Sequence, residues 1–487
     1  MGHLYYDNKN FAGGAFEKKI IKSVYFGAEL LWPHLPPVLT VDPLTIKFEG
    51  LGSSFNVNVT IANKPDALYS IITPSWLSVT NKTQTGFTLT AGENLTGALL
   101  DGEVIVSLDD FPNQTQTIEV QQAIEPLIII YYDASISSTA IINLSNDVDW
   151  QSTRIDWGDG TIVDAIQYQN VHTYTDTSKV YKCTIRNLLN VPANLTYVGT
   201  DSNKNIVEVQ LMGGLTSIGL RAFWWAVNLK KINISNTLVE TIGDSAFGDC
   251  HKLSGLIKLE NVTYVSPSAF IGVGVDYKDP NSPSGDDLLP GSPMLDVDLT
   301  GSPMDTFMGF SYVSNLRSMK ISEKTPNITN NALTGCFSLT DLLVPYQGIT
   351  IGSQAFSGCR RLTGTIKINA VSIGTGAMGD TGNKNNPSGL IWDLSDSTIT
   401  EVNMFGSSGA NQIILPPTIT QVSDWSLSYT SQIQILKFNS TTPPITTGNP
   451  GLYPAPAGFI ILVPINSVAA YKQATYWTQF QNNIQGF

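Results

Sequence analysis

From residue 39 to residue 123 the chain alternates apolar and polar residues in short runs such as SFNVNVTIA and GEVIVSLD. Such alternation places successive side chains on opposite faces of a strand. Turn residues separate the runs at roughly 8–12 residue spacing, which is typical of a β-sandwich. We expect Trp76, which follows the turn residue Pro74, to fill the core of this sandwich.

A second β unit is predicted over residues 126–200. It contains the stretch IDWGDGTIV, which begins at Ile155, and the stretch HTYTDTSKVYKCTI, which begins at His172. Pro36 and Pro37 precede the first unit and favour a stiff, extended connection to the residues before it. The first half of the chain is therefore expected to consist of β units joined in series.

From about residue 205 to residue 442 the pattern changes to a longer repeat. Its frame, IG..AF.GC..L, is centred on an alanine followed by an apolar residue, and diverged copies lie at 304–321 and around Phe405 and Trp425. A period of this length predicts a solenoid, because one repeat cannot bury its apolar face alone. The Pro/Gly/Asp-rich stretch 272–293 interrupts the repeat, and we expect it to project from one rim. The clearest copies place the central alanine at Ala222, Ala246, Ala269, Ala332, Ala355 and Ala377.

Both ends of the chain carry their own patterns. Residues 20–33 (IIKSVYFGAELLWP) predict a β-hairpin with its turn near Gly27. Such a hairpin is marginal alone and should dock on another chain or domain. At the other end a last strand is expected to finish at Pro464, and a short helix should begin at Asn466 or Ser467. The helix would cap the repeats with an apolar face of Val468, Tyr471 and Ala474 or Thr475, followed by Trp477, Phe480 and Ile484.

Composition narrows the functional classes. Charged residues make up 14% of the chain, against about 25% in a typical soluble domain. The formal net charge is −13, so we expect no binding to nucleic acid and no attachment to anionic membranes. No apolar run approaches the ~20 residues of a membrane-spanning helix. Residues 1–34 also lack the continuous apolar core of a signal peptide, since Gly27 and Glu29 break it.

The candidate chemistry is sparse, and we predict neither a catalytic centre nor a cofactor. The four cysteines form no CxxC pair, and we expect small buried side chains at Cys183, Cys250, Cys336 and Cys359. The four histidines, His3, His34, His172 and His251, lie in different modules, so no catalytic triad is expected. We expect His172 to make a structural hydrogen bond and His251 to face solvent. A pair of carboxylates that hydrolyses glycosidic bonds stays an open alternative, which a solenoid does not favour.

Two local patterns have competing interpretations. In DWGDGT, Asp156, Asp159 and Asp164 could hold a metal, but glycines occupy two ligand positions of a calcium loop. The simpler interpretation is a tight turn in which the carboxylates accept backbone N–H bonds. In AFWWAVN, Trp224 and Trp225 replace small polar residues, and both rings cannot easily point inward. We predict that they cover the junction with the second β unit or contact a ligand.

Three family resemblances follow from these motifs. The first unit resembles a BACON domain, through WLSV at 76–79, Asn94 in AGEN, GEVIV at 102–106 and IEVQQ at 118–122. The second resembles a PKD-type immunoglobulin-like domain, through WGDG at 157–160, His172 with Tyr174, and the strand 181–185. The repeat resembles the BspA-type leucine-rich repeats of bacterial and protist surface adhesins. These resemblances imply accessory, binding or adhesive modules without catalysis.

The expected architecture is mainly β. An N-terminal anchor segment precedes two immunoglobulin-like β-sandwich domains, and a leucine-rich-repeat solenoid follows with a small C-terminal helical cap. The solenoid includes the inserted loop at about 272–293. The expected bounds are 1–34 for the docking segment, 35–124 for the BACON-like domain, 125–202 for the PKD-like domain, 203–445 for the solenoid and 446–487 for the cap.

The resemblances imply two functional classes. One is a non-enzymatic virion protein of a Bacteroidetes phage, such as a head or tail fibre or other appendage, because BACON domains also occur in tail-associated proteins of crAss-like phages. The other is a secreted Bacteroidetes surface adhesin or carbohydrate-binding protein. Because residues 1–34 show no export signal, the sequence favours the virion exterior over the bacterial cell surface.

The virion hypothesis also predicts partners. The N-terminus would dock on capsid, collar or tail proteins, the chain would form a homo-oligomer, and the outer modules would bind a bacterial surface glycan or protein. No membrane insertion is expected. The predicted anchoring interface consists of Tyr5, Tyr6, Phe11, Phe16, Tyr25, Phe26, Leu31 and Trp32.

Overall fold

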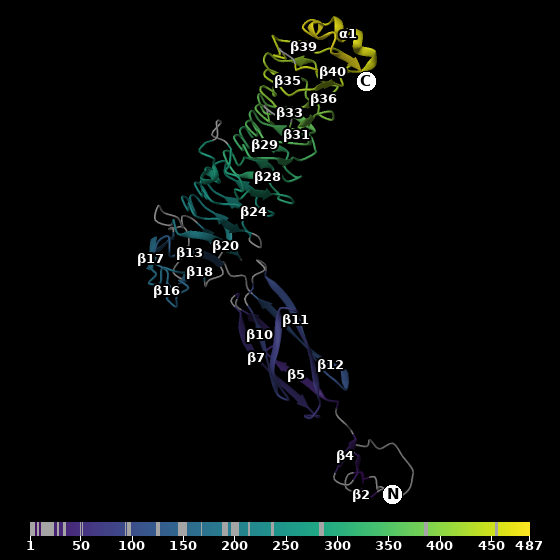
Figure 1. The fold of residues 1–487 in the computed structure, drawn as a ribbon. Coiled ribbons are helices and arrows are strands. Elements are labelled where there is room, and N and C mark those ends of the chain that lie inside the picture. The colour runs from purple at the N-terminus through teal and green to yellow at the C-terminus, as the bar shows by residue number, and fades with distance from the viewer. Residues whose placement is uncertain are drawn as a thin grey trace. The chain divides into compact units, whose positions relative to one another are not determined.

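A computed structural model describes most of the 487 residues, which form two compact units, Met1–Glu125 and Pro126–Phe487 (Figure 1). Before residue 36 only the strand segments 5–6, 9–10, 24–26 and 29–32 are described. From residue 36 onward the description is continuous except at 49, 51, 93, 95–98, 123–126, 145–152, 167, 188–192, 196–203, 213–214, 235–237, 282–286, 384–387 and 453–455.

Two small antiparallel pairs lie at the start of the first unit. Strand β1 (Tyr5–Tyr6) pairs with β2 (Lys9–Asn10), and β3 (Val24–Phe26) pairs with β4 (Glu29–Trp32). The second pair confirms the hairpin that the sequence predicts around Gly27.

Two four-stranded sheets form the rest of the first unit, in the orders β5-β7-β10-β9 and β6-β12-β11-β8. Inward side chains of both sheets belong to one buried cluster, as the alternating sequence pattern predicts. All pairings are antiparallel except β6 with β12. The strands are β5 (Val38–Asp42), β6 (Thr45–Phe48), β7 (Ser53–Ala62), β8 (Tyr69–Ile72), β9 (Leu77–Thr83), β10 (Gly86–Ala91), β11 (Leu100–Leu108) and β12 (Phe111–Gln122).

The expected core tryptophan of this unit lies at its margin. Trp76 is only partly buried, and its ring meets Phe48 edge-on at 5.8 Å between centroids. The next residue, Leu77, is 7% exposed and begins β9. Because side chains alternate along a strand, burying Leu77 turns its neighbour toward the edge of the core.

The second unit begins with a six-stranded sheet that leads directly into the repeats. Its order is β16-β15-β18-β13-β20-β22, and a two-stranded sheet pairs β14 with β17. Strand β20 is antiparallel to β13 on one side and parallel to β22 of the first coil on the other. The strands are β13 (Leu127–Asp133), β14 (Thr139–Leu144), β15 (Thr153–Asp156), β16 (Ile162–Asp164), β17 (Tyr168–Thr173), β18 (Val180–Asn187), β20 (Ile206–Met212) and β22 (Lys231–Asn233).

The coils contribute two series of short parallel strands, and together they build the solenoid (Figure 1). One series continues β20 and β22 with β24 (Gly255–Lys258), β26 (Leu295–Asp298), β28 (Leu316–Lys320), β30 (Asp341–Leu343), β32 (Thr365–Lys367), β34 (Ile391–Asp393), β36 (Gln412–Leu415), β38 (Ile435–Phe438), β40 (Ile460–Val463) and β41 (Ile484–Gly486). The other comprises β19 (Ala193–Leu195), β21 (Leu215–Ile218), β23 (Thr241–Ile242), β25 (Tyr264–Val265), β27 (Thr306–Phe307), β29 (Asn327–Ile328), β31 (Ile349–Ile351), β33 (Ala370–Ile373), β35 (Glu401–Val402), β37 (Gln421–Val422) and β39 (Ile445–Thr446).

The Ala-aromatic step forms the turn between the two strands of a coil. Its alanine and the following apolar residue are buried, as at Ala246 and Phe247. The Phe247 N–H donates to the carbonyl of Ala269 in the next coil at 2.8 Å, so the turns themselves are stacked. Phenylalanine rings stack in the same direction, with Phe270 5.1 Å from Phe247 and 4.7 Å from Phe310 between centroids. The repeat thus satisfies both its backbone and its apolar side chains through neighbouring coils.

Each turn also needs left-handed backbone beside the alanine. The residue before it and the residue three after it have positive φ in several coils, for example 58° at Asn331 and 73° at Gly335 around Ala332. Glycine adopts this conformation without a steric cost. In other residues the Cβ comes too close to the backbone, which destabilises the conformation. The second glycine of the frame IG..AF.GC, such as Gly335, therefore supplies the left-handed residue that the turn needs.

The described residues of the inserted loop contact the turns of later coils. Its described residues include the 3₁₀ helix η2 (Val275–Tyr277), and the Lys278 ammonium lies 5.7 Å from the ring centroid of Phe337. Asp287 pairs with the Arg361 guanidinium at 2.8 Å. These contacts hold the described part of the loop against later coils, and the projection of the loop from one rim stays a prediction.

A small helical segment follows β40, as predicted, but β40 is not the last strand as expected, because β41 with Ile484 comes after the helix. The segment consists of η3 (Ile465–Ser467), α1 (Val468–Gln473) and η4 (Trp477–Phe480). Tyr471 and Trp477 are fully buried against the last coils, and β41 then pairs with β40. The Trp477 indole N–H donates to the carbonyl of Pro444 at 2.9 Å. The segment therefore covers the apolar end of the solenoid core.

The phenylalanine stack provides a test of this packing. Replacing Phe270, which is 1% exposed, with alanine should lower the free energy of unfolding by about 3–5 kcal/mol, because it leaves a cavity between two rings. The matched control Leu343→Ala removes a side chain that is 57% exposed and should change it by no more than about 0.5 kcal/mol. Urea unfolding followed by circular dichroism measures both, and equal effects would contradict the stacked core.

Candidate functional site

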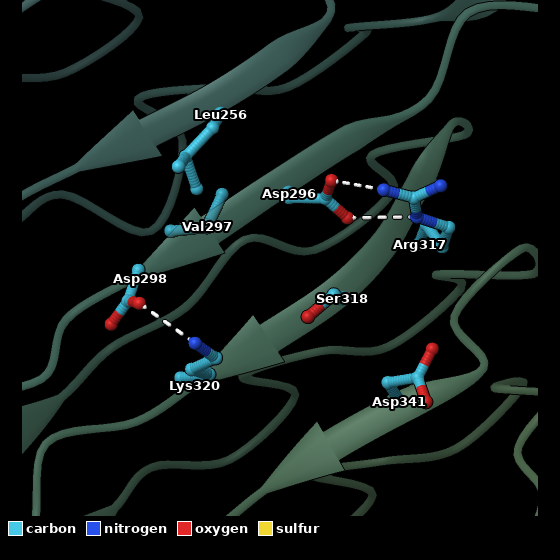
Figure 2. Close-up of a pocket in the computed structure, with 8 residues that line it drawn as sticks. All are labelled: Leu256, Asp296, Val297, Asp298, Arg317, Ser318, Lys320 and Asp341. Carbon is cyan, nitrogen blue, oxygen red and sulfur yellow. Dashed lines mark hydrogen bonds and ion pairs between the residues drawn. The ribbon is translucent and has the colours of Figure 1, made fainter.

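A hollow lies on the outer face of the solenoid, over four consecutive strands of one series (Figure 2). Its volume is about 420 Å³. Strands β24, β26, β28 and β30 contribute its residues, so each coil supplies only part of the surface. The lining residues are Leu256, Asp296, Val297, Asp298, Arg317, Ser318, Lys320 and Asp341.

A bulge in β28 aims two successive side chains at this hollow. Leu316 and Met319 are both buried although they are three positions apart, and Arg317 and Ser318 face outward between them. The pairing of β26 with β28 shifts register at this point. An extra residue of this kind bends a strand and redirects its side chains. The bulge therefore brings the Arg317 side chain over β26.

Ion pairs connect the strands across the hollow. The Arg317 Nε donates to Asp296 Oδ1 at 3.0 Å, and a second guanidinium nitrogen donates to Asp296 Oδ2. The Lys320 Nζ donates to Asp298 Oδ2 at 3.0 Å. The carboxylate side chains are only 21% and 19% exposed, whereas those of Arg317 and Lys320 are 52% and 49% exposed. The acids on β26 are thus more recessed than the cations, which lie beside them on the neighbouring strand β28 (Figure 2).

The hydrogen bonds around Asp298 favour its ionised form. Burial tends to raise the pKa of Asp298, but hydrogen bonds from Thr300 and Lys320 outweigh it and hold the pKa below its ordinary value. The hydrogen bond and charge of Asp296 raise the pKa of Arg317. A general acid or base needs a pKa near the working pH. The hollow is therefore suited to binding a polar ligand by charge and hydrogen bonds.

The sequence patterns described above do not point to these residues. The paired positions are 21 and 22 residues apart, which is one repeat, so opposite charges at one outward position of adjacent coils are a usable signal. The sequence does not predict the bulge that aligns Arg317. Strict alternation of side chains along LRSMK (residues 316–320) would place a different set of residues on the outer face.

The two adjacent tryptophans make most of their contacts within the solenoid. Their rings stack at 5.6 Å between centroids, and Arg221 lies 4.9 Å from the ring centroid of Trp224. The Trp224 indole N–H donates to Asp249 Oδ2 in the following coil at 3.3 Å. Trp225 is 37% exposed. One ring is thus held by the next coil and the other is open to solvent, while a junction or ligand contact stays a prediction.

The DWGDGT motif forms a hydrogen-bonded turn. Asp156 Oδ1 accepts the N–H of Gly158 at 2.9 Å, and Asp159 Oδ1 accepts that of Thr161 at 3.0 Å. The second oxygen of Asp159 is 2.7 Å from His172 Nε2, whose ring stacks on Trp157 at 5.0 Å. This confirms the turn interpretation and the structural hydrogen bond of His172.

The other candidate groups serve the structure. His251 is not simply solvent-facing, since its Nδ1 lies 3.1 Å from Asp276 Oδ1 in the inserted loop. The four cysteines are buried and unpaired with one another, which confirms the expectation. Burial raises the pKa of the Cys336 thiol to about 12, so it stays protonated at neutral pH. Its Sγ donates to the carbonyl of Phe310 at 3.1 Å.

The predicted N-terminal interface lies where little is described. Strands β1, β3 and β4 contain six of its residues, namely Tyr5, Tyr6, Tyr25, Phe26, Leu31 and Trp32. Outside the described residues lie Phe11 and Phe16, together with His3 and His34. Elsewhere in the described part of the chain no cluster of three His, Cys, Asp or Glu side chains could hold a metal ion. Nor does any described helix have the length and apolar character needed to cross a membrane.

Comparison with known proteins identifies the repeat. The chain contains a BspA type leucine rich repeat region with six copies, matched over residues 173–279 and 307–386. No curated protein matches the chain. The match begins before the first coil, at the end of β17, and continues through the strands that join the second β unit to the solenoid.

Three solved structures of bacterial proteins are similar to this chain. A leucine rich cell surface protein of Faecalibacterium prausnitzii is 21% identical and covers 55% of this chain and 81% of its own, with a TM-score of 0.25. A leucine-rich repeat protein of Bacteroides ovatus is 15% identical, with 65% and 90% covered and a TM-score of 0.27. One of Eubacterium ventriosum is 13% identical, with 68% and 88% covered and a TM-score of 0.27.

Proposed function

We propose that this protein is a non-enzymatic adhesion protein that binds its ligand through the outer surface of the leucine-rich-repeat solenoid. The observation that carries the proposal is the hollow over β24, β26, β28 and β30, because four coils combine there into one charged surface. Binding by a composite surface uses area and complementarity, which the rigid stacking of coils supplies.

The chemistry of the hollow supports binding over catalysis. Each of the two recessed acids is bonded to a cation within 3.0 Å, and the pKa of Asp298 lies below its ordinary value. The mixed charges would instead recognise a partner that carries both signs or many hydroxyl groups. We therefore infer a protein or glycan of a cell surface as the ligand.

The proposal includes the two β units before the solenoid. The first has two four-stranded sheets around one core, which is compatible with a BACON-like sandwich. In the second, the buried Trp157 and the bonded pair of His172 and Asp159 are compatible with a PKD-like domain. We infer that these units are accessory modules of an adhesin displayed on a bacterial cell surface.

Charge reversal in the hollow tests the proposal. The double variant Arg317→Glu, Lys320→Glu should reduce binding to the surface that the native chain recognises at least fivefold, because two cations become acids beside recessed acids. The control Lys231→Glu disrupts a similar 3.3 Å pair with Glu208 on the first coils and should leave binding unchanged.

The assay uses beads coated with the full chain and wells coated with mucin, collagen or bacterial polysaccharide. Adhesion to at least one coating and its selective loss in the double variant are expected. Failure to bind every coating, or equal losses in the double variant and the control, would contradict an adhesive role for the hollow.

A second candidate is a virion appendage whose N-terminus docks on capsid, collar or tail proteins. The observation in its favour is that residues before 36 form the pairs β1–β2 and β3–β4, and two-stranded sheets are marginally stable without a partner. In this case the chain would form a homo-oligomer on the particle and present the solenoid to the host.

Deletion of residues 1–34 tests this candidate. The truncated chain should be absent from purified phage particles while the full chain is incorporated, as measured by immunoblotting of the particles. Incorporation of the truncated chain would contradict docking through the N-terminus. Detection of the full chain on bacterial cells that carry no phage would favour the adhesin instead.

A further inference from the structure

A second cavity lies near the C-terminal end of the solenoid, beside the turn between β37 and β38. Its volume is about 310 Å³, which is within the range of small-molecule sites. This turn contributes five of the lining residues, and the next coil contributes three. The lining residues are Trp425, Ser428, Tyr429, Thr430, Ser431, Gly451, Leu452 and Pro456.

Two aromatic rings stand beside this cavity in costly positions. Trp425 and Tyr429 occupy the two left-handed positions of the turn, with φ of 55° and 54°. Bulky residues are rare there, since their Cβ contacts the backbone at a cost of about 1–2 kcal/mol. At the position of Tyr429, other coils have Gly272, Gly335 and Gly358, but also Trp225 and Tyr312, with φ of 62° and 59°. Left-handed backbone is thus a regular feature of the coils, and this turn differs in placing aromatic side chains at both of its left-handed positions.

Burial of the two aromatic side chains does not offset this backbone strain. Trp425 is 57% exposed and Tyr429 is 75% exposed, whereas the core positions between them, Ser426 and Leu427, are buried. The Trp425 N–H donates to the carbonyl of Asn449 and the Leu427 N–H to that of Pro450, so the backbone of the turn is held as in other coils. Strained positions that persist without a packing benefit are typical of binding sites.

We propose that this cavity binds a neutral sugar unit of a glycan, which rests on the proposed adhesive function and specifies its ligand. None of the eight lining residues is charged, so an acidic sugar or an ionic peptide would find no counter-charge. A sugar ring has an apolar C–H face and a rim of hydroxyls. The Trp425 and Tyr429 rings would cover that face, and the hydroxyl-bearing side chains of Ser428, Thr430 and Ser431 border the same cavity.

The size of the cavity argues against an extended peptide. A polyproline segment advances 3.1 Å per residue and needs a groove several residues long. The lining residues come from one turn and the single coil that follows it, with Gly451 as a wall where an added Cβ would lie 2.7 Å from the Cα of Ser428. A compact ring ligand fits such a bounded site better.

The test is native gel electrophoresis of the full chain in gels that contain neutral mannan, β-glucan or galactan, with polygalacturonate as the acidic probe. At least one neutral polysaccharide should retard the chain, and Trp425→Ala or Tyr429→Gly should weaken that retardation at least tenfold in apparent affinity. Ser407→Gly is the matched control, because Ser407 occupies the corresponding left-handed position of the preceding coil at φ 64°. It should leave the retardation unchanged.

Thermal unfolding separates a binding role from a structural one. Glycine prefers the backbone of residue 429, so Tyr429→Gly should unfold at a temperature no lower than the native chain. A marked fall would show that the ring is structural and overturn the inference. So would the absence of retardation in every neutral gel, retardation by polygalacturonate alone, or binding of a polyproline peptide at the same residues. In each case adhesion through the charged hollow could still hold, because Arg317 and Lys320 lie outside this cavity.

Discussion

A single coil of this solenoid cannot bury its own apolar side chains, and the second unit depends on that constraint. Each Ala-aromatic turn donates its N–H groups to the next coil, and each phenylalanine ring is covered by a neighbour, as Phe270 is by Phe247 and Phe310. The coils must therefore repeat the same backbone path. This requirement explains the left-handed positions beside the alanine and the glycines that occupy many of them.

The same constraint leaves the outward positions free. Side chains that face solvent do not affect stacking, so successive coils can differ there and combine into composite surfaces. In the charged hollow, Asp296 and Asp298 meet cations from the following coil. In the cavity near the C-terminal end, Trp425 and Tyr429 place aromatic rings at the two left-handed positions of a regular turn. Both are the surfaces for which we propose ligand binding.

Much of the fold could be predicted from the sequence, since periodicity reports burial directly. The repeated alanines, the cysteines, the hairpin around Gly27 and the C-terminal helix follow from local patterns. The bulge at Arg317, the position of Trp76 and the path of the inserted loop could not, because register and long-range pairs such as Asp287 with Arg361 determine them. The candidate sites could not be predicted either, because each one combines residues that lie about one repeat apart in the sequence.

The central claim is that one core runs from β13 through the coils to β41, with β20 shared by the second β unit and the repeats. Hydrogen exchange measured by mass spectrometry at increasing urea concentration tests it most directly. The account predicts that peptides covering β13, β20 and β22 lose protection at the same urea concentration, because they share one sheet. Loss of protection in β13 and β20 at a clearly different concentration from β22 would show separate units and contradict the account.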